Sequence, residues 1–285
     1  MKITVAESAG FCFGVKRAVD EVYNQIEHGK KPVYTFGPVI HNEQVMQELE
    51  AKGVSVVDSL EDLEQLDSSS GTLIIRAHGV SRRTEEKMRT SGLNIIDTTC
   101  PFVKKIHAIV QEKSREGLSV IIAGNPDHPE VKGIRGWAEG PVYIVETPEE
   151  MQALELPDGA SAVLVAQTTF NLLKFEYMVE IFSQKRYYNT VVNTVCNATT
   201  KRQAEARRIA AEVDAMLVIG GRHSSNTQKL CEICKAGCKN TYFIETLVDL
   251  ETIPFQSFCH VGITAGASTP NQIIEEVQEK LCQKN

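Results

Sequence analysis

The chain has 285 residues, 42% of them hydrophobic, and carries a formal net charge of −7. That much apolar sequence is enough for an ordinary buried core, and the acidic balance argues against a nucleic-acid partner held by a broad basic surface. The apolar stretches are only as long as β-strands, so we expect no membrane-spanning segment and no signal peptide, and we expect a cytoplasmic protein.

In chain order, strand-like and helix-like segments alternate. An apolar strand at 2–10 leads to Cys12, and an amphipathic helical segment with early Lys and Arg residues follows at 13–22. The same order of strand, cysteine and basic helix recurs around Cys100 and Cys196. The three cysteines divide the chain into nearly equal parts, which predicts a threefold internal repeat.

Each part also contains two strands that end in polar loops, at similar distances from its cysteine. The first of these loops are VYTFGPVIHNE, SVIIAGNPDHPE and MLVIGGRHSSN, and the second are TLIIRAHGVS, AVLVAQTTFN and HVGITAGASTPN. Parallel strands that alternate with helices bring such loops together with the cysteines at the carboxyl ends of the strands. The repeat therefore predicts one polar, cysteine-bearing edge in each part.

These patterns predict an α/β fold of three similar small domains with mainly parallel sheets, in a pseudo-threefold arrangement. The expected domains are 13–99, 100–195 and 196–285. The third part ends without a strand that leads into a cysteine, whereas the chain begins with one. We therefore expect residues 1–12 to complete the sheet of the third domain.

If the three edges face one another, Cys12, Cys100 and Cys196 meet, each at a helix N-terminus with basic residues nearby. Such surroundings favour thiolates over thiols. Three thiolates suit a Zn²⁺ ion with one open position, or an iron–sulfur cluster in which one iron lacks a protein ligand. The cluster fits a wide, three-sided site better. Three unrelated structural cysteines are the alternative.

A second cysteine group, CEICKAGC, contains Cys231, Cys234 and Cys238. Its local spacing is typical of a metal motif, but it is also the spacing of one buried helical face. The corresponding positions of the first repeat hold no ligands. We favour the structural interpretation, although a role in redox sensitivity stays open.

The quoted motifs together resemble the LytB/IspH family, the 4-hydroxy-3-methylbut-2-enyl diphosphate reductases. The resemblance rests on motifs in the same order along nearly the whole chain: GFCFGV, HN, RAHG, DTTCP, HPE, QTT, NTVCNAT, SSN and TAGASTP. It implies a monomer of three α/β domains around a [4Fe–4S] cluster. It also implies reductive dehydroxylation of the allylic diphosphate to isopentenyl and dimethylallyl diphosphates, the last step of the methylerythritol phosphate route, with ferredoxin or flavodoxin as electron donor.

The resemblance also assigns roles to individual residues. Cys12, Cys100 and Cys196 would hold the cluster, Glu130 would deliver protons, and Thr168 would lie near the substrate hydroxyl. Donors from the polar loops would bind the diphosphate: His41, His78, His128, Ser224, Ser225, Asn226 and Ser268. The residues alone do not rank Glu130 above Glu43, which also follows a histidine by two positions; the resemblance favours Glu130.

Three other functions remain open at this point. A non-redox iron–sulfur hydro-lyase would use the open iron only to assist water loss, and would turn over without a reductant. An iron–sulfur redox sensor would have little need for polar loops beside its cluster. A structural zinc protein is the third alternative, which metal analysis would reveal.

Overall fold

The computed structural model describes residues 1–66, 70–157 and 159–283. Within them the chain forms three four-stranded sheets, and every strand pairing in these sheets is parallel. By their contacts these residues divide into two compact units. Unit 1 comprises Met1–Val15, His41–Gln44 and the chain from Asn197 on, and unit 2 comprises Lys16–Ile40 and Val45–Cys196.

The first sheet lies in unit 2 and has the order β3-β2-β4-β5. Leu73, Ile74 and Ile75 on β4 are completely buried, as expected for a central strand of a parallel sheet that is covered on both faces. One face packs against Leu63 of α3 and Met88 of α4. Its strands are β2 (Val33–Phe36), β3 (Val54–Val57), β4 (Thr72–Ile75) and β5 (Asn94–Asp97), and its helices are α1 (Phe13–His28), α2 (Glu43–Ala51), α3 (Leu60–Glu64) and α4 (Arg82–Arg89).

The second sheet, also in unit 2, repeats this topology with the order β7-β6-β8-β9. Helices α5 and α6 cover one face and α7 and α8 cover the other. Its strands are β6 (Ser119–Ala123), β7 (Val142–Val145), β8 (Ser161–Ala166) and β9 (Tyr188–Val191), and its helices are α5 (Pro101–Arg115), α6 (Pro129–Arg135), α7 (Pro148–Ala153) and α8 (Leu172–Ser183).

The third sheet forms the centre of unit 1, with the order β1-β12-β10-β11. Helices α9 and α10 pack on one face, and η1 and α11 pack on the other. Its strands are β1 (Lys2–Val5), β10 (Ala215–Ile219), β11 (Thr241–Ile244) and β12 (His260–Ala265), and its helices are α9 (Asn197–Ala210), α10 (Ser225–Gly237), the 3₁₀ helices η1 (Leu247–Thr252) and η2 (Phe255–Ser257), and α11 (Asn271–Gln283).

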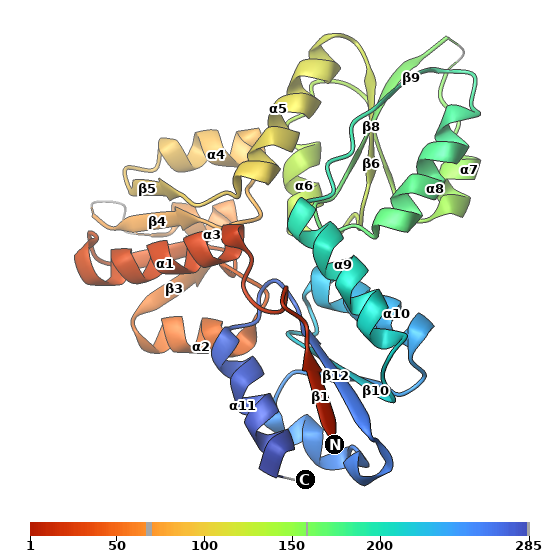
Figure 1. The fold of residues 1–285 in the computed structure, drawn as a ribbon. Coiled ribbons are helices and arrows are strands. Elements are labelled where there is room, and N and C mark those ends of the chain that lie inside the picture. Colours follow the sequence, from red (N-terminus) through yellow and green to blue (C-terminus); the bar gives the residue numbers. More distant parts are fainter. Residues whose placement is uncertain (67–69, 158, 284–285) are drawn as a thin grey trace. The chain divides into compact units, whose positions relative to one another are not determined.

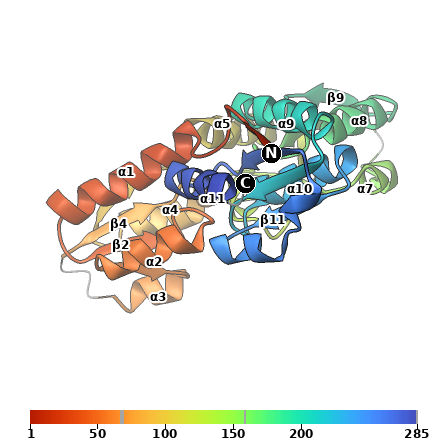
Figure 2. The ribbon, with the colours of Figure 1, turned by 60° about the horizontal axis from the view of Figure 1, so that its bottom comes forward.

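Strand β1 takes the place in this sheet that β5 and β9 take in the other two. Its Cα partners run from Lys2 opposite His260 to Val5 opposite Ile263. In Figures 1 and 2 the N-terminal strand lies close to the end of α11, and Ile3 of β1 packs against the core to which α11 contributes. The three sheets thus share one topology, which confirms the predicted fold of three similar parallel α/β domains.

Candidate functional site

Each predicted ligand cysteine lies directly before a helix. Helix α1 begins after Cys12, α5 after Cys100 and α9 after Cys196. The main-chain N–H groups of the three cysteines donate to carbonyls at equivalent positions of the three sheets. Each carbonyl lies two residues after a strand that takes the same place in its sheet, β12, β4 or β8. The acceptors are the oxygens of Ala267 (3.2 Å), Ala77 (3.0 Å) and Thr168 (3.0 Å), respectively. The hydrogen bonds of the three cysteines therefore follow the internal repeat that the sequence predicts.

The eight cysteines are all free thiols, but they differ in exposure. Cys12, Cys100 and Cys196 are half-buried. The cysteines of the CEICKAGC motif lie on α10 and at its end, and all three are buried. They pack in an apolar cluster with residues of α9 and β10, such as Ile209 and Met216.

Burial raises the pKa of the Cys231 thiol, and it raises that of Cys234 to about 12. Neutral thiols surrounded by aliphatic side chains behave as small apolar residues. Their environment therefore favours a packing role over a metal site.

Glu130 is the predicted proton donor, and only 2% of its surface is exposed. It lies in the first turn of α6. Its Oε1 accepts the main-chain N–H of Thr168 (2.6 Å), and its Oε2 accepts the Thr168 hydroxyl (2.8 Å). Because the carbonyl of Thr168 also accepts the N–H of Cys196, Thr168 connects the predicted acid to the loop of a predicted ligand.

Desolvation sets the protonation of Glu130. Burial raises its pKa from 4.5 to about 7, although the two hydrogen bonds from Thr168 favour the ionised form and oppose part of the rise. A carboxyl group with a pKa near neutrality can hold and release a proton at cellular pH. Glu43, by contrast, is the exposed first residue of α2.

Two predicted histidines of unit 2 lie next to each other. His128 is the N-cap of α6, and its Nδ1 accepts the main-chain N–H of Glu130 (3.1 Å). This bond leaves Nε2 as the nitrogen that carries the proton in the neutral ring. The rings of His78 and His128 meet edge to face, with centroids 5.3 Å apart.

The remaining predicted residues belong to unit 1 and surround the start of α10. Ser224 is the N-cap of this helix, and its Oγ accepts the N–H of Thr227 (3.4 Å). The Ser268 hydroxyl donates to the carbonyl of His41 (3.0 Å) and lies 3.4 Å from the Ser224 hydroxyl. Ser225 and Asn226 form the first turn of α10.

Asn226 has a feature that points to a ligand. The residue is 4% exposed, and its Nδ2 is buried without a hydrogen-bond partner among the residues that the structure describes. A buried N–H donor without an acceptor is costly. A helix N-terminus favours negative charge, so an anion bound at this position can supply that acceptor.

One buried charged residue that the sequence analysis did not single out is Arg202 on α9. It is 3% exposed, and it donates to main-chain carbonyls of Ser8 and Gly10, in the loop that leads to Cys12. The internal repeat could have indicated Arg202, which lies six residues after Cys196. Six residues after the other two cysteines the chain has Ala18 and Ile106, both apolar, so a charged residue at this position is unusual.

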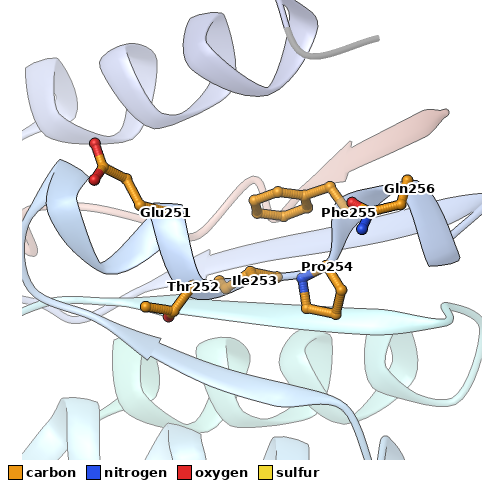
Figure 3. Close-up of a pocket in the computed structure, with 6 residues that line it drawn as sticks. All are labelled: Glu251, Thr252, Ile253, Pro254, Phe255 and Gln256. Atoms are coloured by element: carbon orange, nitrogen blue, oxygen red, sulfur yellow. The ribbon is translucent and has the colours of Figure 1, made fainter.

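A cavity lies elsewhere in unit 1. It has a volume of about 460 Å³ and is lined by residues 251–256, around η1 and η2 (Figure 3). This segment leads into the amino end of β12, whereas the predicted site residues follow the carboxyl ends of strands. None of the predicted site residues lines this cavity.

The chain has three parallel sheets of one topology. Polar loops and helix-starting cysteines follow the carboxyl ends of their strands. These features define a multidomain α/β protein of the class that binds ligands at the carboxyl edges of its sheets. Within the described residues, no helix combines the length and the apolar character that crossing a bilayer requires.

The chain belongs to the LytB protein family, whose profile matches residues 3–282. A 4-hydroxy-3-methylbut-2-enyl diphosphate reductase of Caldanaerobacter subterraneus subsp. tengcongensis is 46% identical over 282 residues, which cover 99% of this chain and 96% of the relative. The reductase of Clostridioides difficile is 43% identical over 277 residues, which cover 97% of this chain and 98% of the relative.

Solved structures give the same result. An E-1-hydroxy-2-methyl-but-2-enyl-4-diphosphate reductase from Plasmodium falciparum matches with a TM-score of 0.91 and 29% identity, over 98% of this chain and 87% of that chain. A second structure matches with a TM-score of 0.69 and 41% identity over all of both chains. It is of an (E)-4-hydroxy-3-methyl-but-2-enyl diphosphate reductase, described as the terminal enzyme of the non-mevalonate pathway. The resemblance stated from the motifs is thus confirmed.

Proposed function

We propose that this chain is an iron–sulfur oxidoreductase that converts 4-hydroxy-3-methylbut-2-enyl diphosphate to isopentenyl and dimethylallyl diphosphates, the last step of the non-mevalonate route to isoprenoids. The reaction consumes two electrons and two protons. The allylic C–O bond breaks and a C–H bond forms, so that one proton leaves with the oxygen as water and the other goes to carbon. The buried carboxyl of Glu130, held by two hydrogen bonds from Thr168, is the observation that carries this proposal.

Cys12, Cys100 and Cys196 would hold a [4Fe–4S] cluster. Their half-buried thiols and their equivalent main-chain bonds support this assignment. When bound, such a cluster supplies electrons and one iron without a protein ligand, which is a Lewis acid for the alcohol oxygen. We propose the three domains 13–99, 100–195 and 196–285, the last completed by 1–12, as the parts that bring these cysteines together.

The diphosphate would bind to neutral hydrogen-bond donors rather than to a lysine clamp. The N-terminus of α10, where the helix dipole favours anions, and the buried Nδ2 of Asn226, which has no hydrogen-bond partner among the described residues, support this assignment. Imidazole N–H groups add charge when a polyanion raises their pKa. The residues with this proposed role are His41, His78, His128, Ser224, Ser225, Asn226 and Ser268.

Glu130 and Thr168 would handle the protons. The Thr168 hydroxyl donates to Oε2 of the ionised Glu130. When Oε2 carries a proton, the direction of this bond reverses: the carboxyl donates to the Thr168 oxygen, and the Thr168 hydroxyl can donate to the substrate oxygen. One proton transferred in this direction lets the oxygen depart as water instead of hydroxide and leaves Glu130 ionised. Because Glu130 is buried, bulk water does not compete for that proton.

Electrons would come from a small redox protein such as ferredoxin or flavodoxin, and the chain would work as a monomer in the cytoplasm. The eight cysteines are free thiols, which supports a reducing compartment. We propose no nucleic-acid and no membrane partner.

The direct test of the acid is the Glu130→Gln variant, assayed anaerobically with the allylic diphosphate and a chemical reductant. Gln keeps the size of the side chain but has no transferable proton, so we expect turnover to fall by about a hundredfold or more while the visible absorption of the cluster persists. Glu43→Gln is the matched control and retains activity. Full activity of Glu130→Gln would assign the proton to another group.

The non-redox hydro-lyase is the disfavoured alternative, and a need for reductant separates the two reactions. The relatives named above are reductases, which favours the redox reaction. Turnover in the complete absence of a reductant would instead support the hydro-lyase.

A further inference from the structure

Side-chain hydrogen bonds hold the loop before each predicted ligand cysteine. In two of the three loops the acceptor side chain belongs to the loop itself. Asp97 and Asn193 each lie three residues before their cysteine. The Asp97 carboxylate accepts the N–H of Thr99 (2.9 Å), and the Asn193 side chain accepts the N–H of Val195 (3.0 Å). These Asx turns fix the residue that directly precedes Cys100 or Cys196.

The loop before Cys12 has no such turn. The residue three positions before it is Ala9, which has no side-chain acceptor. This loop is also longer, since β1 ends at Val5, seven residues before the cysteine, whereas β5 ends three residues before Cys100. Gly10 in its middle has a φ of +97°, and a Cβ there would lie 2.3 Å from Oδ1 of Asn271.

Two side chains of α9 hold this loop instead. The carboxylate of Glu205 accepts the N–H groups of Glu7 (2.9 Å) and Ser8 (2.9 Å), and also the Ser8 hydroxyl (2.5 Å). The guanidinium of Arg202 donates to the carbonyl of Ser8 through Nε (2.8 Å) and to that of Gly10 through Nη2 (2.6 Å). All these groups belong to unit 1.

Arg202 is unusual for its position in the repeat. The equivalent residues, Ala18 and Ile106, are buried apolar residues that fill the space between helix and sheet. A buried guanidinium is costly unless its donors are satisfied, and its charge-assisted hydrogen bonds to carbonyls are stronger than neutral ones. Where the other two domains have an apolar core residue, the third domain therefore has a charged residue that contacts the Cys12 loop.

We propose that Arg202 and Glu205 are positioning residues that hold the Cys12 loop in the conformation in which its thiolate ligates the cluster, in place of the Asx turns of the other two domains. The inference rests on the proposed function in one respect, that Cys12 is a cluster ligand. Since α9 begins directly after Cys196, one helix would then fix two of the three ligands.

The test uses Arg202→Met and Glu205→Gln in the full chain. Hydrogen exchange of the cluster-free protein should become about tenfold faster in residues 6–12, and unchanged in 97–100 and 193–196. In the anaerobically loaded protein, a chelator should remove iron about tenfold faster than from the wild type. Arg202→Lys, which keeps a charged donor, should restore part of both properties.

Two controls separate positioning from general stability. Arg207→Met changes an exposed basic residue of the same helix and should leave both rates unchanged. Leu250→Ala weakens the core of unit 1 at η1, and should lower the melting temperature without faster iron release. Iron release that follows melting temperature across all variants, or unchanged exchange in residues 6–12, overturns the inference.

If the proposed function is wrong, the measurements give a different result from the one expected if only the positioning role is wrong. A wild-type chain that binds no iron–sulfur cluster contradicts that function, while the exchange measurement on the cluster-free protein still decides whether Arg202 and Glu205 hold the loop. A wild-type chain that binds the cluster, with variants that release iron at the wild-type rate, contradicts only the positioning role.

Discussion

Glu130 shows how the environment of one residue determines its chemistry. Its carboxyl group has a pKa of about 7 in the folded chain, mainly because of burial, against an ordinary value of 4.5. The folded state therefore binds more protons than the unfolded state between these two pH values. Glu130 contributes its full stability below pH 4.5, and that contribution is lost as the pH rises to about 7.

This difference predicts a pH-dependent stability of the cluster-free protein. Between pH 5 and pH 8 the wild type should lose about 3 kcal/mol more free energy of unfolding than Glu130→Gln, which has no titrating group at this position. Denaturant titrations at the two pH values measure the difference. Parallel losses in both proteins would mean that the carboxyl group is already ionised in the folded state.

Residue-level assignments were the hardest to make from the sequence. Glu43 and Glu130 follow a histidine at the same offset, so spacing does not distinguish them, and only the family resemblance favoured Glu130. Their difference in burial depends on what packs over each helix start, which is a tertiary property. Arg202 was missed for a related reason, because its partners are main-chain carbonyls nearly two hundred residues away.

At the scale of single elements, the N-terminus of α10 combines a helix cap with the proposed diphosphate site. Ser224→Ala removes the acceptor for the N–H of Thr227, which should cost about 1 kcal/mol of stability. It also removes a hydroxyl from the proposed site, and we expect affinity for inorganic diphosphate to fall about tenfold. Calorimetric titration measures this change.

Ser59→Ala is the matched control, because Ser59 caps α3 with the same type of bond (3.0 Å to the N–H of Asp62). It should lower stability with no effect on diphosphate affinity. Equal affinities of the Ser224→Ala variant and the wild type would exclude this helix start from the site.

The cysteines of α10 illustrate what periodicity predicts at this scale. Their spacing matched both a metal motif and a helical face, and the structure places all three among apolar side chains. Cys234→Ala should therefore cost about 1 kcal/mol of stability, the effect of a small cavity, and should leave the iron content unchanged. Iron analysis of the purified variant checks this, and a loss of iron would restore the metal interpretation.

At the scale of the whole molecule, the repeat made the fold predictable. Matching motifs at matching offsets implied three sheets of one topology, and the strand orders β3-β2-β4-β5, β7-β6-β8-β9 and β11-β10-β12-β1 agree with this. Periodic patterns encode such local βα units well, because each unit buries its own apolar face. The path of the loop from Ala6 to Cys12 was not predictable, since side chains of α9 determine it.

In the proposed enzyme, Cys12, Cys100 and Cys196, one from each third of the chain, hold a single cluster. Iron and acid-labile sulfide content of the anaerobically purified chain tests this assignment most directly, in the wild type and in Cys12→Ser, Cys100→Ser and Cys196→Ser. We predict about four irons and four sulfides per wild-type chain, and loss of most of both in each variant. A variant that keeps the full content, or a wild-type chain that contains zinc alone, would contradict the account.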